Sequence, residues 1–384
     1  MTISISTVRP KTIDAFVDGE KKTIPISLTN PDYQRIVGQI YQFLAGDFIR
    51  YTAFPYQIKF GNYIYILYSD GTAHGVTDRQ ILLRKHVNDI ENFLIEWETV
   101  VFFENSTTVY DLSLFDNLSE GEFLTLKSWI IKKTSGVISA TIVSQVLVSG
   151  YSDPDIDGVY ALWSKVSEYA GKFYRTGYKA TDASFIGDPT ITLLDEWDCC
   201  LFESTDQINY TIKGVIAKGT GNLKQYNEAD IIEKTASNYL ALIRNETDDA
   251  AREIYESTST DLITWTSPVL STRFEGTQPE LFKDSSGIIY AAFGDRTGSS
   301  GLNDIGKANN NTDVTGVQIQ KSITPYTTFS YPAVFSLNWS TDGGQFKMSE
   351  YSPNKFIGVF YGSPSSTKEP VIYAKLFTSE NIPM

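Results

Sequence analysis

The chain has 384 residues, of which 41% are hydrophobic and 13% aromatic, so it can bury the core of one large domain or of two ordinary ones. A formal net charge of −14 argues against binding nucleic acid or an anionic membrane over a broad surface. With two adjacent cysteines, Cys199 and Cys200, and only two histidines, we expect no disulfide framework, no metal site and no cofactor.

Residues 1–46 differ from the rest. Two short alternating runs precede TNPDYQRIVGQIYQFLAG, in which Asn30 can cap a helix, Pro31 suits its first turn and Gly46 ends it. We expect a helix over 31–45 and a small α/β attachment module, which docks onto a partner or simply caps the body. No secretory signal and no 18-residue apolar run is visible, so we expect a soluble protein without a membrane span.

From Phe54 onward, β runs and turns alternate. FPYQIKFGNYIYILYSDG contains two β runs around Gly61-Asn62, which indicates a hairpin. A seven-residue pattern with Asp third and an aromatic residue seventh then recurs as VNDIENF (87–93), STDQINY (204–210), STDLITW (259–265) and STDGGQF (340–346). In such turns the carboxylate accepts hydrogen bonds from backbone amides, so we expect these residues to be structural.

A second repeat predicts where the inner strands of a ring begin. It occurs at Phe54-Pro55, Asp153-Pro154, Asp188-Pro189 and Gln278-Pro279, with Glu228-Ala229 as a variant. The wide gap between the first two starts leaves room for an extra blade or an insertion. The fold class predicted is all-β, a β-propeller over 47–384 with six blades, or five as the alternative.

The clearest internal copy relates residues 226–247 to residues 277–298. Glu228 precedes Arg244 by 16 positions, and Glu280 precedes Arg296 by the same number. A planar guanidinium pairs bidentately with a carboxylate, so Glu228 and Arg244 form either an inter-strand ion pair in the channel or part of a ligand site. Arg296 could instead be a surface residue beside the loop TGSSG.

These features resemble the sialidase superfamily. The S-x-D turns resemble its Asp boxes, NEADIIEKTASNYLALIR resembles the segment in which a Glu precedes a substrate-binding Arg, and SEYSPNKFIGVFYG resembles the segment with the nucleophilic Tyr. The resemblance implies Tyr351 as nucleophile and Glu228 as its base, because a phenol with a pKa near 10 needs a neighbouring carboxylate to attack. Tyr351 could otherwise be a packed aromatic at a strand end.

The same resemblance implies a cluster of arginines that holds a sugar carboxylate. Its candidate members are Arg50, Arg244 and Arg296. The acid/base aspartate would lie after the first hairpin, where Asp70 competes with His74 and Asp78.

A second resemblance is to the five-bladed furanosidase and xylosidase clan. Asp153, Asp188 and Glu228 would then face the channel as substrate-binding or acid/base carboxylates. Phe54 stands where that clan has its base Asp, and turn capping is the alternative role for Asp153 and Asp188.

Two classes of function remain open. The first is a sialidase-like glycoside hydrolase acting on a surface polysaccharide or acidic sugar, and the second is a propeller that binds glycans without cleaving them. The apparent lack of a signal peptide, the low cysteine content and the N-terminal module suit a virion protein, so we expect a phage tail receptor-binding protein or tailspike. Other tail proteins would bind residues 1–46, a homo-oligomer could form, and a purely structural tail component is a third possibility.

Overall fold

The computed structural model describes most of the chain, namely residues 12–17, 20–25, 42–46, 49–73, 77–92, 96–104, 109–179, 196–247, 253–295, 315–323, 326, 329–330, 333–363 and 369–382. Regular structure in these ranges consists of β-strands and short 3-10 helices. The 3-10 helices are η1 (Val87–Asp89), η2 (Ser113–Phe115), η3 (Pro154–Ile156) and η5 (Ser379–Asn381). No helix of the described residues is long and apolar enough to cross a membrane.

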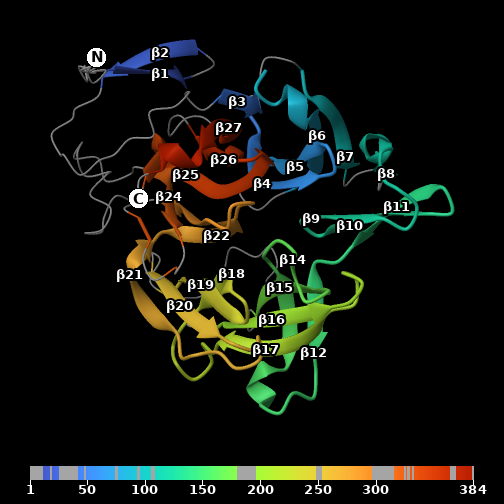
Figure 1. Cartoon of the computed structure of the whole chain (residues 1–384), viewed down its shortest axis with the longest axis vertical. Helices are drawn as coiled ribbons and strands as arrows, with labels where there is room; N and C mark the ends of the chain where they lie inside the picture. Colours follow the sequence, from blue (N-terminus) through green and yellow to red (C-terminus); the bar gives the residue numbers. More distant parts are fainter. Residues whose placement is uncertain are drawn as a thin grey trace.

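The strands form a six-bladed β-propeller, which confirms the predicted fold class (Figure 1). The first blade contains β4 (Tyr51–Phe60), β5 (Tyr63–Gly71), β6 (Arg79–His86), β7 (Glu98–Glu104) and β8 (Val109–Tyr110). The second contains β9 (Phe123–Leu126), β10 (Trp129–Thr134) and β11 (Val137–Ile142). The third contains β12 (Gln145–Val148), β13 (Gly158–Leu162), β14 (Ser167–Tyr169), β15 (Lys172–Lys179), β16 (Asp198–Ser204) and β17 (Thr211–Ala217).

One strand links the last two blades. The fourth blade contains β18 (Tyr226–Thr235), β19 (Asn238–Asn245), β20 (Glu253–Ser259) and β21 (Val269–Glu275). The fifth contains β22 (Thr277–Lys283), β23 (Ile289–Asp295), β24 (Thr315–Ser322) and the first part of β25 (Ala333–Ser352). The sixth contains the second part of β25, β26 (Lys355–Ser363), β27 (Val371–Thr378) and β3 (Gln42–Ala45).

The N-terminal part of the chain closes the ring, because β3 pairs antiparallel with β27. The predicted helix over 31–45 is therefore wrong at 42–45, and residues 26–41 lie outside the described residues. The physical reason is tertiary. Pairing with β27 supplies ladder hydrogen bonds, and Leu44 packs against an apolar cluster, which together outweigh a weak helix propensity. Before it, β1 (Thr12–Val17) and β2 (Glu20–Pro25) form a separate hairpin.

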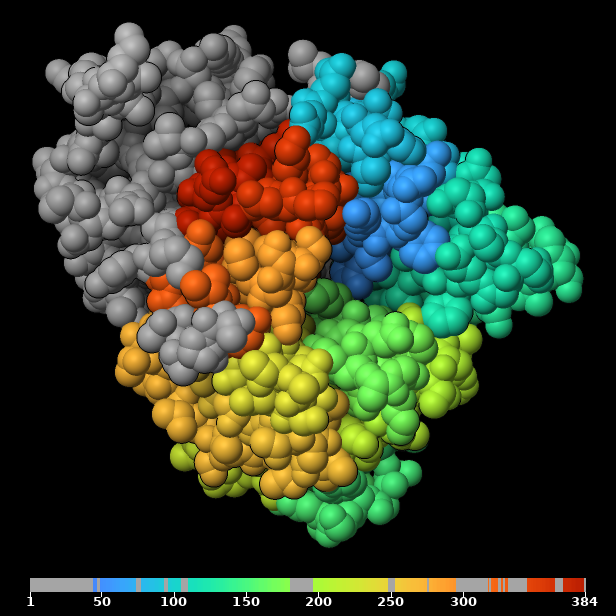
Figure 2. All heavy atoms as spheres, viewed as in Figure 1, coloured from blue at the N-terminus to red at the C-terminus, as the bar shows by residue number. Residues whose placement is uncertain are grey.

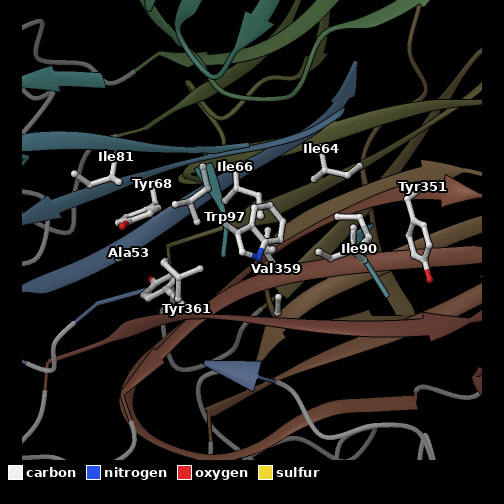
Figure 3. Close-up of a cluster of buried hydrophobic side chains, with 14 of the residues drawn as sticks. Ala53, Ile64, Ile66, Tyr68, Ile81, Ile90, Trp97, Tyr351, Val359 and Tyr361 are labelled. Atoms are coloured by element: carbon white, nitrogen blue, oxygen red, sulfur yellow. The ribbon is translucent and has the colours of Figure 1, made fainter. Parts of the chain in front are cut away.

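The core lies between neighbouring blades. Figure 3 shows the cluster between the first and sixth blades, in which Ile64 and Ile66 of β5 pack with Val359 and Tyr361 of β26. All four side chains are fully buried. Alternate residues of each strand face such a cluster, as expected for blades that are covered on both faces.

The Asp-aromatic turns are only partly as predicted. In 204–210, Asp206 accepts hydrogen bonds from the amides of Ile208 and Asn209, which confirms the capping role there. Asp261 does the same in 259–265, for Ile263 and Thr264. In the other two segments the prediction is wrong. Residues 340–346 lie inside the long strand β25, and residues 87–89 form η1 with His86 as its cap.

Four inner strands share one irregularity at their start, where a bulge inserts an extra residue opposite the second strand. The bulged positions of β4, β18, β22 and β25 are Phe54, Glu228, Gln278 and Gln345. Two residues further along the same strands lie Tyr56, Asp230, Glu280 and Lys347. The predicted inner-strand starts at 54, 228 and 278 are thus equivalent. The predicted start at Asp153 is wrong, because Asp153 caps the exposed helix η3.

Candidate functional site

A charged cluster lies at the start of the fourth blade, at one end of the central channel. The Arg244 guanidinium on β19 donates to Glu228 Oε2 at 2.8 Å through Nη1 and to Glu246 Oε1 at 2.9 Å through Nη2. The predicted ion pair between Glu228 and Arg244 therefore exists. We call Glu228, Arg244 and Glu246 the mouth cluster.

The strand register explains this geometry. The bulge at Glu228 lets Asn227 pair with Arg244 while Ala229 pairs with Ile243, so Glu228 is the extra residue and its side chain turns toward the neighbouring strand. Arg244 is 4% exposed and Glu228 is 7% exposed, whereas about a third of the Glu246 side chain is exposed. The cluster therefore reaches from the buried channel wall to the surface.

Amide side chains donate hydrogen bonds to both carboxylates of the mouth cluster, and Asn227 Nδ2 bonds Glu246. Gln278 donates through Nε2 to Glu228 Oε1 at 3.4 Å. The amide oxygens of Asn227, Gln278 and Gln345 are buried and have no hydrogen-bond partner among the described residues. These oxygens are enclosed by protein atoms, so the groups of the mouth cluster that a ligand can reach are carboxylate oxygens, above all those of the partly exposed Glu246.

Aromatic side chains border the same place. Tyr178 of β15 stacks on Trp197 with 5.8 Å between ring centroids, and Trp163 packs against Tyr178 at 6.3 Å. Burial, together with the negative charges of Glu228 and Glu246, raises the pKa of Tyr178 above its usual value. Trp163, Tyr178 and the bulged Phe54 are each partly exposed. In space-filling view the centre of the ring is hollowed where blue, green and orange segments meet (Figure 2).

Deeper in the channel the next layer of side chains forms a buried ionic network that the sequence did not predict. Glu280 accepts a hydrogen bond from Lys165 at 3.0 Å and is also bonded by Lys347. Asp230 lies 3.8 Å from Lys165 and accepts from the Leu281 amide. Burial raises the pKa of Asp230 to about 6, whereas the two lysines in contact with Glu280 hold the pKa of Glu280 below its usual value.

Arg50 and Asp70 form an ion pair with each other and not with the mouth cluster. Asp70, at the end of β5, accepts from Arg50 Nε at 2.8 Å and from Arg79 Nε at 2.6 Å. The other branch of Arg50 donates to Asp78 at 2.8 Å. Both predicted residues are therefore engaged within an ion-pair network of the first blade.

Tyr351 does not lie beside Glu228. It is six residues beyond Gln345 on β25, about 20 Å along an extended strand. Figure 3 shows its ring at the edge of the apolar cluster between the first and sixth blades. Burial raises the pKa of Tyr351 to about 12, and the nearby Glu91 adds to the shift.

The remaining predicted residues fall elsewhere. Asp153 is on the surface, where Lys218 bridges it to Asp155. Arg296 and Asp188 lie outside the described residues. The register also corrects the internal copy: Thr277 pairs with Gly294 as Asn227 pairs with Arg244, so Gly294 holds the position of Arg244.

A separate pocket of about 290 Å³ opens where β18 and β22 end, next to β14. Its lining includes Tyr169, Ile232 and Phe282. Lys283 in its wall already donates to the carbonyls of Glu233 and Lys234. Among the described residues, no group of three His, Cys, Asp or Glu side chains could hold a metal ion.

By sequence, no protein family and no curated protein matches this chain. The solved structures that share its fold include the following two. A protein of unknown function from Dyadobacter fermentans is 12% identical, with a TM-score of 0.63 over 88% of this chain and 97% of that one. The phage phi92 endosialidase is 10% identical, with a TM-score of 0.52 over 94% of this chain and 71% of that one. A Bombyx mori β-fructofuranosidase is more distant, at 12% identity and a TM-score of 0.41 over 90% of this chain and 62% of that one.

Proposed function

We propose that this propeller binds a neutral saccharide at the mouth cluster and serves as a receptor-binding protein of a phage tail. The observation that carries the proposal is the pair of carboxylate acceptors around Arg244, Glu228 and Glu246, of which the Glu246 side chain is about a third exposed. Saccharide hydroxyls are donors that such acceptors can bind. The partly exposed rings of Trp163 and Tyr178 offer apolar faces for a sugar ring.

Charge favours a neutral sugar over an acidic one. The mouth cluster has two carboxylates and one guanidinium, and both carboxylates already pair with that guanidinium. Arg50, the second predicted arginine, is paired with Asp70 and Asp78. A sugar carboxylate would have to displace a protein carboxylate from its arginine and would meet the negative charge of the other.

The same geometry favours binding over hydrolysis. The tyrosine that the sialidase resemblance implies as nucleophile, Tyr351, is about 20 Å along β25 from the bulge that faces Gln278. Asp70, the implied acid, is fixed by two arginines. Neither residue is placed to act on a sugar held by Glu228.

The assignment to a phage tail rests on two supports of unequal weight. The fold is similar to that of a phage endosialidase over 94% of this chain. The second support is the N-terminal segment, residues 1–46, whose sequence differs from the rest and which we expect to attach the propeller to other tail proteins. Its last strand, β3, closes the ring by pairing with β27.

The test is a glycan array with neutral and acidic host polysaccharides, followed by mass spectrometry of the bound sugars. The wild type is compared with a Glu228→Gln, Glu246→Gln double variant, which keeps the side-chain shapes and removes both carboxylates of the mouth cluster. The matched control is Glu256→Gln, since Glu256 pairs with the surface arginine Arg273 in the same blade. Thermal unfolding confirms that each variant is folded.

We expect the wild type and the control to bind neutral glycans. The double variant should lose at least about tenfold in affinity for them, which corresponds to ~1.4 kcal/mol, and should gain affinity for acidic glycans. Wild-type binding to acidic glycans alone would overturn the neutral assignment. Cleavage products would show that the protein hydrolyses the glycan. Equal binding by the wild type, the double variant and the control would show that the mouth cluster does not bind it.

A further inference from the structure

A buried arginine of the third blade has no charged partner among the described residues. Arg175 on β15 is 1% exposed. Its Nε donates to the carbonyl of Ser164 at 2.9 Å and its Nη1 to the carbonyl of Val143 at 3.4 Å. The remaining nitrogen, Nη2, has no hydrogen-bond partner in the described part of the chain.

A second unpartnered polar atom belongs to the same region. The Tyr210 side chain packs in the apolar cluster of the third blade, against which Val143 also packs. Arg175 reaches the carbonyl of that same Val143, so the guanidinium and the apolar cluster that contains Tyr210 both lie next to Val143. The Tyr210 hydroxyl is buried and makes no hydrogen bond with any described residue.

The first blade contributes a third group. Tyr56 holds the channel position equivalent to Asp230 and is 4% exposed. Its phenol lies within electrostatic range of Arg175, as does that of Tyr210. Two phenolic hydroxyls, which can donate to an anion, are thus close enough to the guanidinium for its charge to act on them.

The charge of this part of the channel is positive although the chain as a whole is acidic. The cationic side chains are Lys127, Lys165, Arg175 and Lys347, and the carboxylates are Asp230 and Glu280. The carboxylates of Glu280 and Asp230 pair with Lys165 and Lys347. Neither carboxylate forms an ion pair with Arg175 among the described residues. Burying an unpaired guanidinium is costly, and arginine does not lose its proton to avoid this.

We propose that a small monovalent anion of the size of chloride is bound in the interior of the propeller, between Arg175 Nη2 and the hydroxyls of Tyr210 and Tyr56. The anion supplies the missing counter-charge and accepts from the two buried donors without a partner among the described residues, Arg175 Nη2 and Tyr210 Oη. This site is distinct from the mouth cluster and independent of the saccharide proposal. Its role is to hold the first and third blades together across the channel.

The direct test is diffraction from wild-type crystals grown with sodium bromide in place of chloride. We expect an anomalous bromide peak within hydrogen-bond distance of Arg175 Nη2 and Tyr210 Oη. An ordered water with no anomalous signal at that place would overturn the proposal.

The solution test is thermal unfolding in sodium chloride against sodium gluconate at equal ionic strength. We expect chloride to raise the Tm of the wild type by about 2 °C or more. Tyr210→Phe should lose this rise, because it removes one donor and keeps the ring. The matched control is Tyr160→Phe, since Tyr160 lies in the same cluster but its hydroxyl donates to the carbonyl of Ile156. An equal chloride effect in all three proteins, or none in the wild type, would contradict the site.

Discussion

The fourth and fifth blades are built on the same strand pattern, yet among their described residues only the fourth has an ion pair at the bulge of its inner strand. Glu228 and Gln278 occupy the same bulge, Asp230 and Glu280 follow two residues later, and Arg244 faces the first bulge where Gly294 faces the second. The backbone therefore fixes where side chains enter the channel. The residue at each point decides whether that entry is charged, neutral or empty.

Close packing between blades explains part of this difference. A Cβ added at Gly294 would lie 3.0 Å from Gly344 Cα and 3.1 Å from Thr277 Oγ1. The fifth and sixth blades thus meet backbone to backbone at the place where the fourth blade has room for a guanidinium. An arginine at position 294 therefore has no space, and the counterpart of the Glu228–Arg244 pair cannot form in the fifth blade.

The largest expected effect on stability is at Glu280, one of the two buried carboxylates of the channel. Glu280→Gln leaves Lys165 and Lys347 buried without their shared carboxylate, so we expect a loss of about 3–5 kcal/mol in the free energy of unfolding. Urea denaturation at pH 7 measures it. A loss below about 1 kcal/mol would show that water reaches these lysines and that the channel is not sealed.

The second prediction concerns the packing of Gly294. Gly294→Ala should destabilise the protein by about 1–3 kcal/mol, because the new methyl group meets backbone of the sixth blade. Saccharide binding at the mouth cluster should be unchanged relative to the wild type once folding is confirmed. A neutral effect on urea unfolding would mean that the two blades can separate at little cost.

Much of this architecture could be predicted from the sequence, and the limits have physical causes. The hairpin around Gly61 and the ion pair between Glu228 and Arg244 depend on local turns and strand pairing, which spacing reveals. The alignment of Glu280 with Glu228 was wrong by two residues, because the two hairpins share one register at an offset of 50 residues while the Glu280-to-Arg296 spacing repeats that of Glu228 to Arg244 at an offset of 52.

The buried ionic network was not predictable in the same way. Lys165, Glu280 and Lys347 come from three different blades, and only closure of the ring brings them together. The C-terminal part of the predicted helix at 42–45 failed for a related reason, since its conformation is set by pairing with β27 at the far end of the chain. Local propensity carries no information about either contact.

The third prediction uses the pH dependence of stability to compare the buried carboxylates of Asp230 and Glu280. Because burial raises the folded-state pKa of Asp230 to about 6, its contribution to stability is present below pH ~3.8 and is lost as pH rises through ~6. Asp230→Asn removes this dependence. We expect the stability of the variant relative to wild type to increase by on the order of 1–3 kcal/mol between pH 4 and pH 7.5 in urea titrations. A difference that is constant with pH would show that Asp230 stays charged, as Glu280 does.

The smallest effect on stability is expected at Tyr351. The variant also tests whether the part of β25 that carries Tyr351 contacts the saccharide. Its hydroxyl lies near the exposed carboxylate of Glu91 while its ring packs in the apolar cluster, so Tyr351→Phe keeps the packing and removes only that polar interaction. We expect a loss of no more than about 1 kcal/mol in stability and no change in saccharide affinity. Gln345→Ala is the matched variant on the same strand, at the bulge equivalent to Glu228 and Gln278. If Tyr351→Phe abolished binding or turnover while Gln345→Ala did not, the ligand would occupy the far end of β25, and the equivalence of the bulges would no longer locate the site.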